Sequence, residues 1–235
     1  MRVCMVHQPH FLPWPGYLAR CLSVDVFVVL DDVKFNRNHF QQRTKFVNRN
    51  GELCWLSLPI ERRTRSSQIK DVEIASDFLF KKWQRPIRES YQDAIFFDQV
   101  WNGIAETILN RLPNFRDIAE NTLEYTLASL SKVSNNSLPE MVQSSTIRTS
   151  EDRTQRLADI CRDQEITHLV MGEYAMATHQ IGELERAGIK LMTQKFIGPE
   201  SAKPISGVMG IHYMMRYGPE DLAEQLNKHW SLEEI

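Results

Sequence analysis

Short apolar runs alternate with amphipathic segments along much of the chain. Two runs near the start, residues 3–6 and 26–30, are rich in β-branched side chains and bounded by polar or turn residues. Buried strands of a parallel sheet have this composition. Between them lie a proline-rich loop and a short amphipathic segment, residues 16–22. We therefore predict a strand, a helix and a parallel strand, the βαβ unit.

A second βαβ unit is predicted near the other end of the chain, with strands at 168–171 and 189–196 and a helix at 181–187. Further strands are expected at 52–60 and 70–75. Residues 77–130 show helical spacing, with Pro86 kinking or restarting the first helix and a break at Pro113. The remaining segments are interpreted as a polar, basic loop at 34–49, a loop at 172–179 and tail helices broken at Gly218.

These patterns predict an α/β fold, a mainly parallel, Rossmann-like sheet with a helical subdomain. We expect residues 1–75 to form an N-terminal α/β unit and residues 76–140 the helical subdomain. Residues 141–235 are expected to form a second α/β unit with C-terminal helices, packed as one domain with 1–75.

Composition narrows the class of protein. Charged residues make up 25% of the 235-residue chain and the net charge is −2, so nothing favours binding to nucleic acid or to an anionic membrane. No apolar run approaches the roughly 18 residues of a membrane span, and no signal peptide is evident. The four cysteines form no close cluster, which indicates buried thiols in a reducing cytoplasm and no metal site.

Polar side chains follow both strands of the first unit. His7, Gln8 and His10 come after the first strand, and Asp31 and Asp32 after the second. Ligands of open α/β sheets bind at such carboxyl ends. An imidazole titrates near neutral pH, so either histidine could act as a base or acid, or bind a phosphate when protonated. The aspartates could orient a histidine, bind a cation or act as a base, and turn or capping chemistry explains them equally well.

Three further groups are candidates for substrate binding. The basic loop, with Asn36, Gln42, Arg43 and Lys45, could hold an anion, or could be a solvated face. Trp14 and Tyr17 could fix the first loop and supply an aromatic wall. Glu173 and His179 of the second unit could meet the first site across the sheet, although each taken alone is more often structural.

Four motifs resemble the WbqC-like family of bacterial proteins: HQPHFLPWPGY, DVFVVLDDVKF, QQRTK and WLSLPI. The likeness continues more loosely through SSTIRTSEDRTQRLADIC, and His10 stands where the family tends to have Asn. The resemblance implies a role in O-antigen, other glycan or specialised-metabolite assembly. It implies transfer of an acyl or aminoacyl group to an amine of a sugar nucleotide or similar small molecule.

In that mechanism His7 or His10 deprotonates the amine, Asp31 or Asp32 orients the histidine, and Arg43 with Lys45 holds an anionic group. A thioester on an acyl or peptidyl carrier protein as donor would leave the protein without need of a cofactor.

Two other functions remain open. The spacing of His7 and His10 resembles the HxGH arrangement of nucleotidylyltransferases, which implies a HUP-like fold and nucleotidyl transfer with ATP and Mg²⁺. A non-catalytic ligand-binding protein would present the same cleft. No glycine-rich phosphate loop of the Walker or Rossmann type supports either nucleotide motif.

Overall fold

The computed structural model describes residues 1–37, 39–134 and 136–235, and these form a six-stranded sheet in the order β5-β2-β1-β6-β7-β8. The first five strands in this order pair in parallel and β8 is antiparallel to β7. The predicted α/β class with a mainly parallel sheet is confirmed. The strands are β1 (Val3–His7), β2 (Val26–Val29), β5 (Glu140–Gln143), β6 (His168–Val170), β7 (Lys190–Phe196) and β8 (Trp230–Glu234).

Both faces of the sheet are buried, which explains the continuous apolar runs in β1 and β2. Successive side chains point to opposite faces, so Met5 and Phe27 join one core cluster while Cys4 and Val26 join another. The larger cluster lies under α1 (Pro15–Cys21), α4 (Phe97–Asn110), α5 (Phe115–Ser134), α9 (Gly210–Tyr217) and α10 (Pro219–His229). The smaller one lies under α6 (Arg153–Asp163), α7 (Glu173–Thr178) and α8 (Ile181–Arg186).

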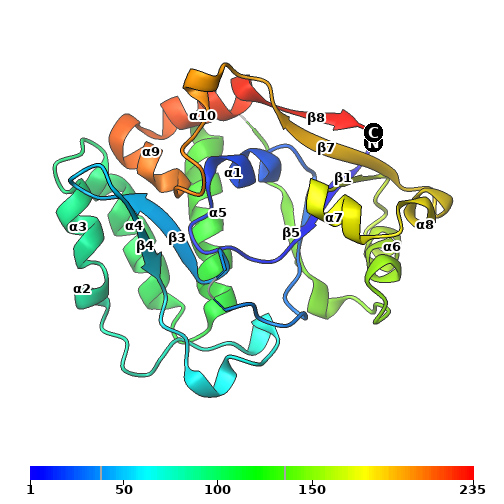
Figure 1. Cartoon of the computed structure of the whole chain (residues 1–235), viewed down its shortest axis with the longest axis horizontal. Coiled ribbons are helices and arrows are strands. Elements are labelled where there is room, and N and C mark those ends of the chain that lie inside the picture. The colour runs from blue at the N-terminus through cyan, green and yellow to red at the C-terminus, as the bar shows by residue number, and fades with distance from the viewer. Residues whose placement is uncertain (38, 135) are drawn as a thin grey trace.

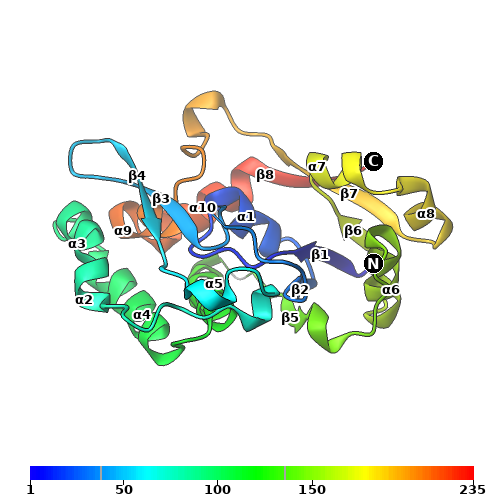
Figure 2. The ribbon, with the colours of Figure 1, turned by 60° about the horizontal axis from the view of Figure 1, so that its bottom comes forward.

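A two-stranded hairpin, β3 (Arg43–Val47) and β4 (Leu53–Ser57), lies with α2 (Phe80–Trp83) and α3 (Arg85–Tyr91) at the opposite end of the molecule from α6 and α8 (Figures 1 and 2). Residues 207–209 run along the free edge of β3. The Lys45 amide donates to the Gly207 carbonyl at 3.3 Å, and the Met209 amide donates to the Lys45 carbonyl at 2.9 Å. These bonds attach the segment before α9 to the hairpin.

Several elements differ from the sequence predictions. β3, β5, β8 and α7 were not predicted, and β8 replaces part of an expected tail helix. Conversely, residues 70–75 form no continuous strand. They contain a 3₁₀ turn, and the amides of Ile74 and Ala75 bond to carbonyls of Pro113 and Pro59 in separate segments. The 3₁₀ turns are η1 (Arg62–Thr64), η2 (Ile69–Asp71), η3 (Ser144–Thr146) and η4 (Glu200–Ala202).

The strand order places a topological switch in the middle of the sheet. After β1 the chain adds β2 and then β5 on one side, and afterwards returns to add β6 on the other side of β1. Connections that leave in opposite directions open a crevice at the carboxyl ends of β1 and β6. Among the described residues, no helix is long and apolar enough to cross a membrane.

Burial of His212 makes the stability of this fold depend on pH. Val47 donates its amide hydrogen to the Tyr91 hydroxyl at 3.1 Å, so that hydroxyl donates its own proton to Nδ1 of His212 at 2.8 Å. Burial, aided by Arg216, lowers the pKa of His212 from 6.5 to about 4. Between these two values the unfolded chain binds a proton that the folded chain does not, so stability is complete above pH 6.5 and falls as the pH drops towards 4.

We therefore expect His212 alone to lower the free energy of unfolding by about 2 kcal/mol between pH 7 and pH 5. Urea unfolding of the wild type and His212→Gln at both pH values measures this difference. The glutamine variant retains an acceptor for Tyr91 but does not titrate, so its loss should be smaller than that of the wild type by this amount. Equal losses in the two proteins would contradict the assignment.

Candidate functional site

A pocket of about 540 Å³ lies at the topological switch. Its floor is made by the ends of β1 and β6, through His7, Gln8, Val170 and Met171. Residues of α1, α6 and α7 and of the segment after β2 form its walls: Arg20, Leu30, Val33, Lys34, Arg153, Arg156, Leu157, Gly172, Tyr174, Ala175 and His179. The predicted position of the site, at the carboxyl edge of the sheet, coincides with this pocket.

The charges around this pocket are all positive. Arg20, Lys34, Arg153 and Arg156 line it, and no Asp or Glu is among its lining residues. Arg20 is held by Gln194, whose Oε1 accepts from its Nε at 3.2 Å. Four cations converging from both faces of the sheet, without a neutralising carboxylate in the lining, favour an anionic ligand.

The start of α6 fixes the two arginines that this helix contributes. Asp152 caps the helix, and its carboxylate accepts from the amides of Thr154 and Gln155 at 3.0 and 2.8 Å. With these amides already bonded, the attraction for an anion at this end comes from the side chains of Arg153 and Arg156. Their spacing of three residues places them on one side of the helix.

His7 is held in one tautomer. Its Nδ1 lies 2.9 Å from the Gln8 carbonyl oxygen, which can only accept, so Nδ1 carries the proton and Nε2 the lone pair. Burial, together with Arg20 and His39, lowers the pKa of His7 to about 4. At neutral pH His7 is therefore an uncharged ring that presents a basic nitrogen, as a general base requires.

A chain of amide groups fixes the orientation of Gln8. The backbone amide of Asn36 donates to Oε1 of Gln41 at 2.9 Å, and a backbone N–H can only donate. Nε2 of Gln41 must then be the donor in its 2.7 Å contact with Oε1 of Gln8. The remaining group, Nε2 of Gln8, is a hydrogen-bond donor beside His7 in the pocket lining.

His10 lies behind His7 in an aromatic cluster. Its ring is 4.8 Å from the His7 ring and 5.2 Å from those of Tyr17 and Trp14, measured between centroids. It is 3% exposed and its Nδ1 has no hydrogen-bond partner in the described structure. Burial, followed by His7 and His39, lowers its pKa well below 6.5. Both histidines are thus neutral at pH 7, which does not favour a role as phosphate-binding cations.

The structure does not bring Asp31 to either histidine. Its fully buried carboxylate accepts from Nη1 of Arg116 at 3.0 Å, and from the amide and hydroxyl of Ser145, each at 2.9 Å. Asp32 accepts from the hydroxyl of Ser144 at 2.5 Å and does not line the pocket. The expected histidine-orienting role of the aspartates is replaced by a network that joins the end of β2 to α5 and to the turn after β5.

The basic loop is also elsewhere. Arg43 and Lys45 lie on β3, where their charged groups are 4.0 and 5.3 Å from the centroid of Trp55. Gln42 donates to the Leu58 carbonyl at 3.2 Å, and its neighbour Gln41 is the residue that contacts Gln8. Asn36 is exposed, and Trp14 faces a different groove.

The second βαβ unit contributes to the pocket in part. His179 lines it, with an Nδ1 that has no hydrogen-bond partner among the described residues and a pKa lowered by burial and by Arg153. Glu173 is exposed at the start of α7 and is not part of the lining. Gln194 meets the first unit through Arg20.

The cysteines show no sign of nucleophilic activation. All four are free thiols, and burial raises the pKa values of Cys4 and Cys21 far above the ordinary range and that of Cys161 to about 12. A thiol in such surroundings is inert. The described residues contain no group of three or more His, Cys, Asp and Glu side chains that could hold a metal ion.

The family model described as the WbqC-like protein family matches residues 8–219, and the chain belongs to this family. An uncharacterized protein of Mycobacterium tuberculosis (strain ATCC 25618 / H37Rv) is 23% identical over 176 residues, which cover 74% of this chain and 74% of that protein. No solved structure matches the chain.

The network around Asp31 leads to a prediction about stability. Asp31→Ala removes the acceptor for a partly buried guanidinium and two serine donors, and breaking a buried pair costs about 3 kcal/mol or more. We expect this loss in urea unfolding. Asp117→Ala is the matched control, because Asp117 also binds Arg116 but is 39% exposed, and we expect it to lose about 1 kcal/mol or less. An Asp31→Ala protein as stable as the wild type would contradict the structural role.

Proposed function

We propose that this protein is a transferase that moves an acyl or aminoacyl group to an amine of a sugar nucleotide or a related anionic small molecule in bacterial glycan or specialised-metabolite biosynthesis. One observation carries the proposal: a neutral histidine with an unprotonated Nε2 lies in a pocket lined by four cations and no carboxylate. Membership of the WbqC-like family supports it. The free thiols fit a cytoplasmic reaction.

The lining suits an acceptor with phosphate groups and a planar base. Arg153 and Arg156 can bind phosphate oxygens through forked hydrogen bonds, which a lysine does not reproduce. Tyr174 is 76% exposed at the pocket wall and offers a ring for stacking. A diphosphate with its nucleoside would thus be held at the α6 and α7 side, with the amine directed to β1.

His7 and Gln8 have complementary roles in the transfer. The cations of the pocket disfavour an ammonium ion, so the acceptor amine is held in its neutral form. As its nitrogen attacks the carbonyl carbon of a thioester, the N–C bond forms and Nε2 of His7 takes the proton. Nε2 of Gln8 donates to the developing oxyanion. The C–S bond then breaks, and His7, a strong acid once protonated, returns the proton to the leaving thiolate.

Nucleotidyl transfer is the second candidate, because the same four cations would suit the phosphates of ATP. It requires oxygen ligands for Mg²⁺, and the pocket lining contains no carboxylate to supply them. Calorimetry with an amino-sugar nucleotide and with ATP and Mg²⁺ distinguishes the two functions, since each predicts tight binding of a different compound.

The cationic wall is tested with uridine diphosphate as a probe. We expect Arg153→Gln and Arg156→Gln each to weaken its binding about 10- to 100-fold, the loss of one charge-assisted hydrogen bond of about 1.5–3 kcal/mol. Arg162→Gln is the matched control, because Arg162 lies on the same helix but pairs with Asp159 and is 70% exposed. Equal affinities of all four proteins in calorimetry would remove the phosphate site from this pocket.

The base is tested by His7→Gln. Loss of a general base lowers the rate about 10²- to 10⁴-fold, and we expect this loss in the release of free thiol from an acyl thioester in the presence of an amino-sugar nucleotide. Because the pKa of His7 is about 4, kcat/KM of the wild type should show no His7 titration between pH 7 and pH 5. Melting curves serve as the control. A His7→Gln protein that melts lower yet turns over normally would show that His7 is structural.

A further inference from the structure

The hairpin carries two cations that the pocket does not use. Arg43 and Lys45 point outward from β3, and in the part of the chain that the structure describes neither forms an ion pair with a carboxylate. Both lie over Trp55, which is 43% exposed on the neighbouring strand, next to Leu53 at 51%. This outward face, Arg43, Lys45, Leu53 and Trp55, is called the hairpin platform below.

The platform adjoins an aromatic groove of about 320 Å³. Phe40 connects the two, since its ring lies 5.4 Å from Trp55 and 5.1 Å from Trp14 between centroids. The groove is lined by Trp14, Pro15, Gly16, Phe40, residues 203–207 and Trp230, and no Asp or Glu is among them. Its volume lies at the lower end of the range for small-molecule sites, about 300–1,000 Å³.

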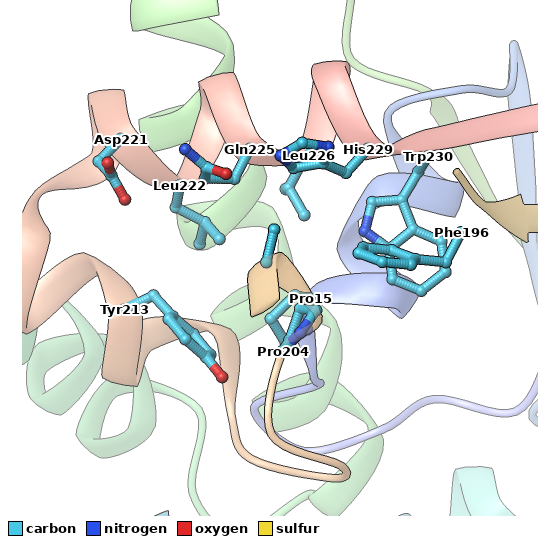
Figure 3. A pocket seen from close by; sticks show the side chains of 11 residues that line it. Pro15, Phe196, Pro204, Tyr213, Asp221, Leu222, Gln225, Leu226, His229 and Trp230 are labelled. Carbon is cyan, nitrogen blue, oxygen red and sulfur yellow. The ribbon is translucent and has the colours of Figure 1, made fainter. Parts of the chain in front are cut away.

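Two glycines keep the groove open. A Cβ atom at Gly16 would lie 2.8 Å from the ring of Trp230, and one at Gly207 would lie 2.8 Å from the ring of Phe40 and 3.5 Å from the Lys45 side chain. Aromatic rings therefore lie directly on bare backbone at both walls. Trp230 is held in place from behind, where its ring packs against Phe196 at 5.2 Å beside a small hollow of about 70 Å³ (Figure 3).

The inner end of the groove meets the pocket through His10. The His10 ring contacts Trp14 and Phe40, which line the groove, and His7, which lines the pocket. His10 is buried and its Nδ1 has no partner. A buried polar atom without a partner costs about 1–3 kcal/mol, which a ligand with a hydrogen-bonding group could recover.

We propose that the aromatic groove binds the phosphopantetheine arm of a carrier protein, which brings the donor thioester to His10. The proposal rests on the transferase function above. It follows from the order of the chemistry along the groove: unpaired cations at the outer end, uncharged aromatic walls in the middle and a neutral imidazole at the inner end. A slender chain with a phosphate at one end and a thioester at the other matches this order.

The platform favours a protein as the source of the arm. A phosphopantetheine arm attached to a protein brings a second surface to the mouth of the groove. The platform offers that surface exposed apolar side chains together with free cations, a combination of tryptophan and arginine that is enriched at protein interfaces. An acidic surface on the carrier would complement Arg43 and Lys45.

The site is tested by titration of the full chain with phosphopantetheine and with pantetheine, which lacks the phosphate, using calorimetry. We expect phosphopantetheine to bind at least about 10-fold more tightly, the effect of a charge-assisted hydrogen bond. Arg43→Gln and Lys45→Gln should each remove most of this difference and leave pantetheine binding unchanged. Gly16→Ala should weaken both compounds by narrowing the groove. Arg49→Gln is the control, because Arg49 lies on the same hairpin but pairs with Asp93.

Absence of phosphopantetheine binding, or binding that none of these variants changes, would overturn the site. The source is decided with a phosphopantetheine-loaded bacterial acyl carrier protein and with coenzyme A. Tighter binding of the loaded carrier than of free phosphopantetheine supports the proposal, and tighter binding of coenzyme A than of the carrier overturns the choice of a protein. These measurements need no turnover, so they can succeed where the His7→Gln rate test fails, and the reverse.

Discussion

The backbone carbonyl of Gln8 accepts two hydrogen bonds, one from Nδ1 of His7 at 2.9 Å and one from the Tyr17 hydroxyl at 3.2 Å. Both lone pairs of that oxygen are thus used, and the rest of the site depends on them. The first bond sets the tautomer of His7, and the second ties the end of β1 to the buried face of α1. The carbonyl is free to accept because β1 stops pairing at His7, where the sheet ends.

The fold brings the cations together from distant parts of the chain. Arg20 follows β1 in α1, Lys34 follows β2, and Arg153 and Arg156 belong to the helix that precedes β6. Strand order alone makes them neighbours, since β2 and β6 lie on either side of β1. Each arginine or lysine by itself looks like an ordinary surface charge. The convergence is therefore a property of the topology.

This explains which parts of the molecule could be predicted from the sequence. The central strands have apolar runs because both their faces are buried, so β1, β2, β6 and β7 were predictable, and with them the position of His7 and Gln8. β3 was not, because its outward residues include two long cations and its pattern resembles a polar loop. Asp31 misled for a different reason: a carboxylate at a strand end has the same sequence whether it faces a ligand or a buried arginine. Gln41 had no signal beyond its neighbour Gln42, and only the direction of the β3 strand separates the two.

The low pKa of His7 and the cationic pocket are connected. Burial is the largest cause of the low value, but Arg20 adds to it by disfavouring a second positive charge nearby. An anion bound beside Arg20 offsets that charge, so the pKa of His7 rises when the acceptor's phosphates occupy the pocket. The base is then strongest when its substrate is in place and weakest when the site is empty. Binding and proton transfer are in this way coupled by one arginine, which Gln194 holds in position from the neighbouring strand of the sheet.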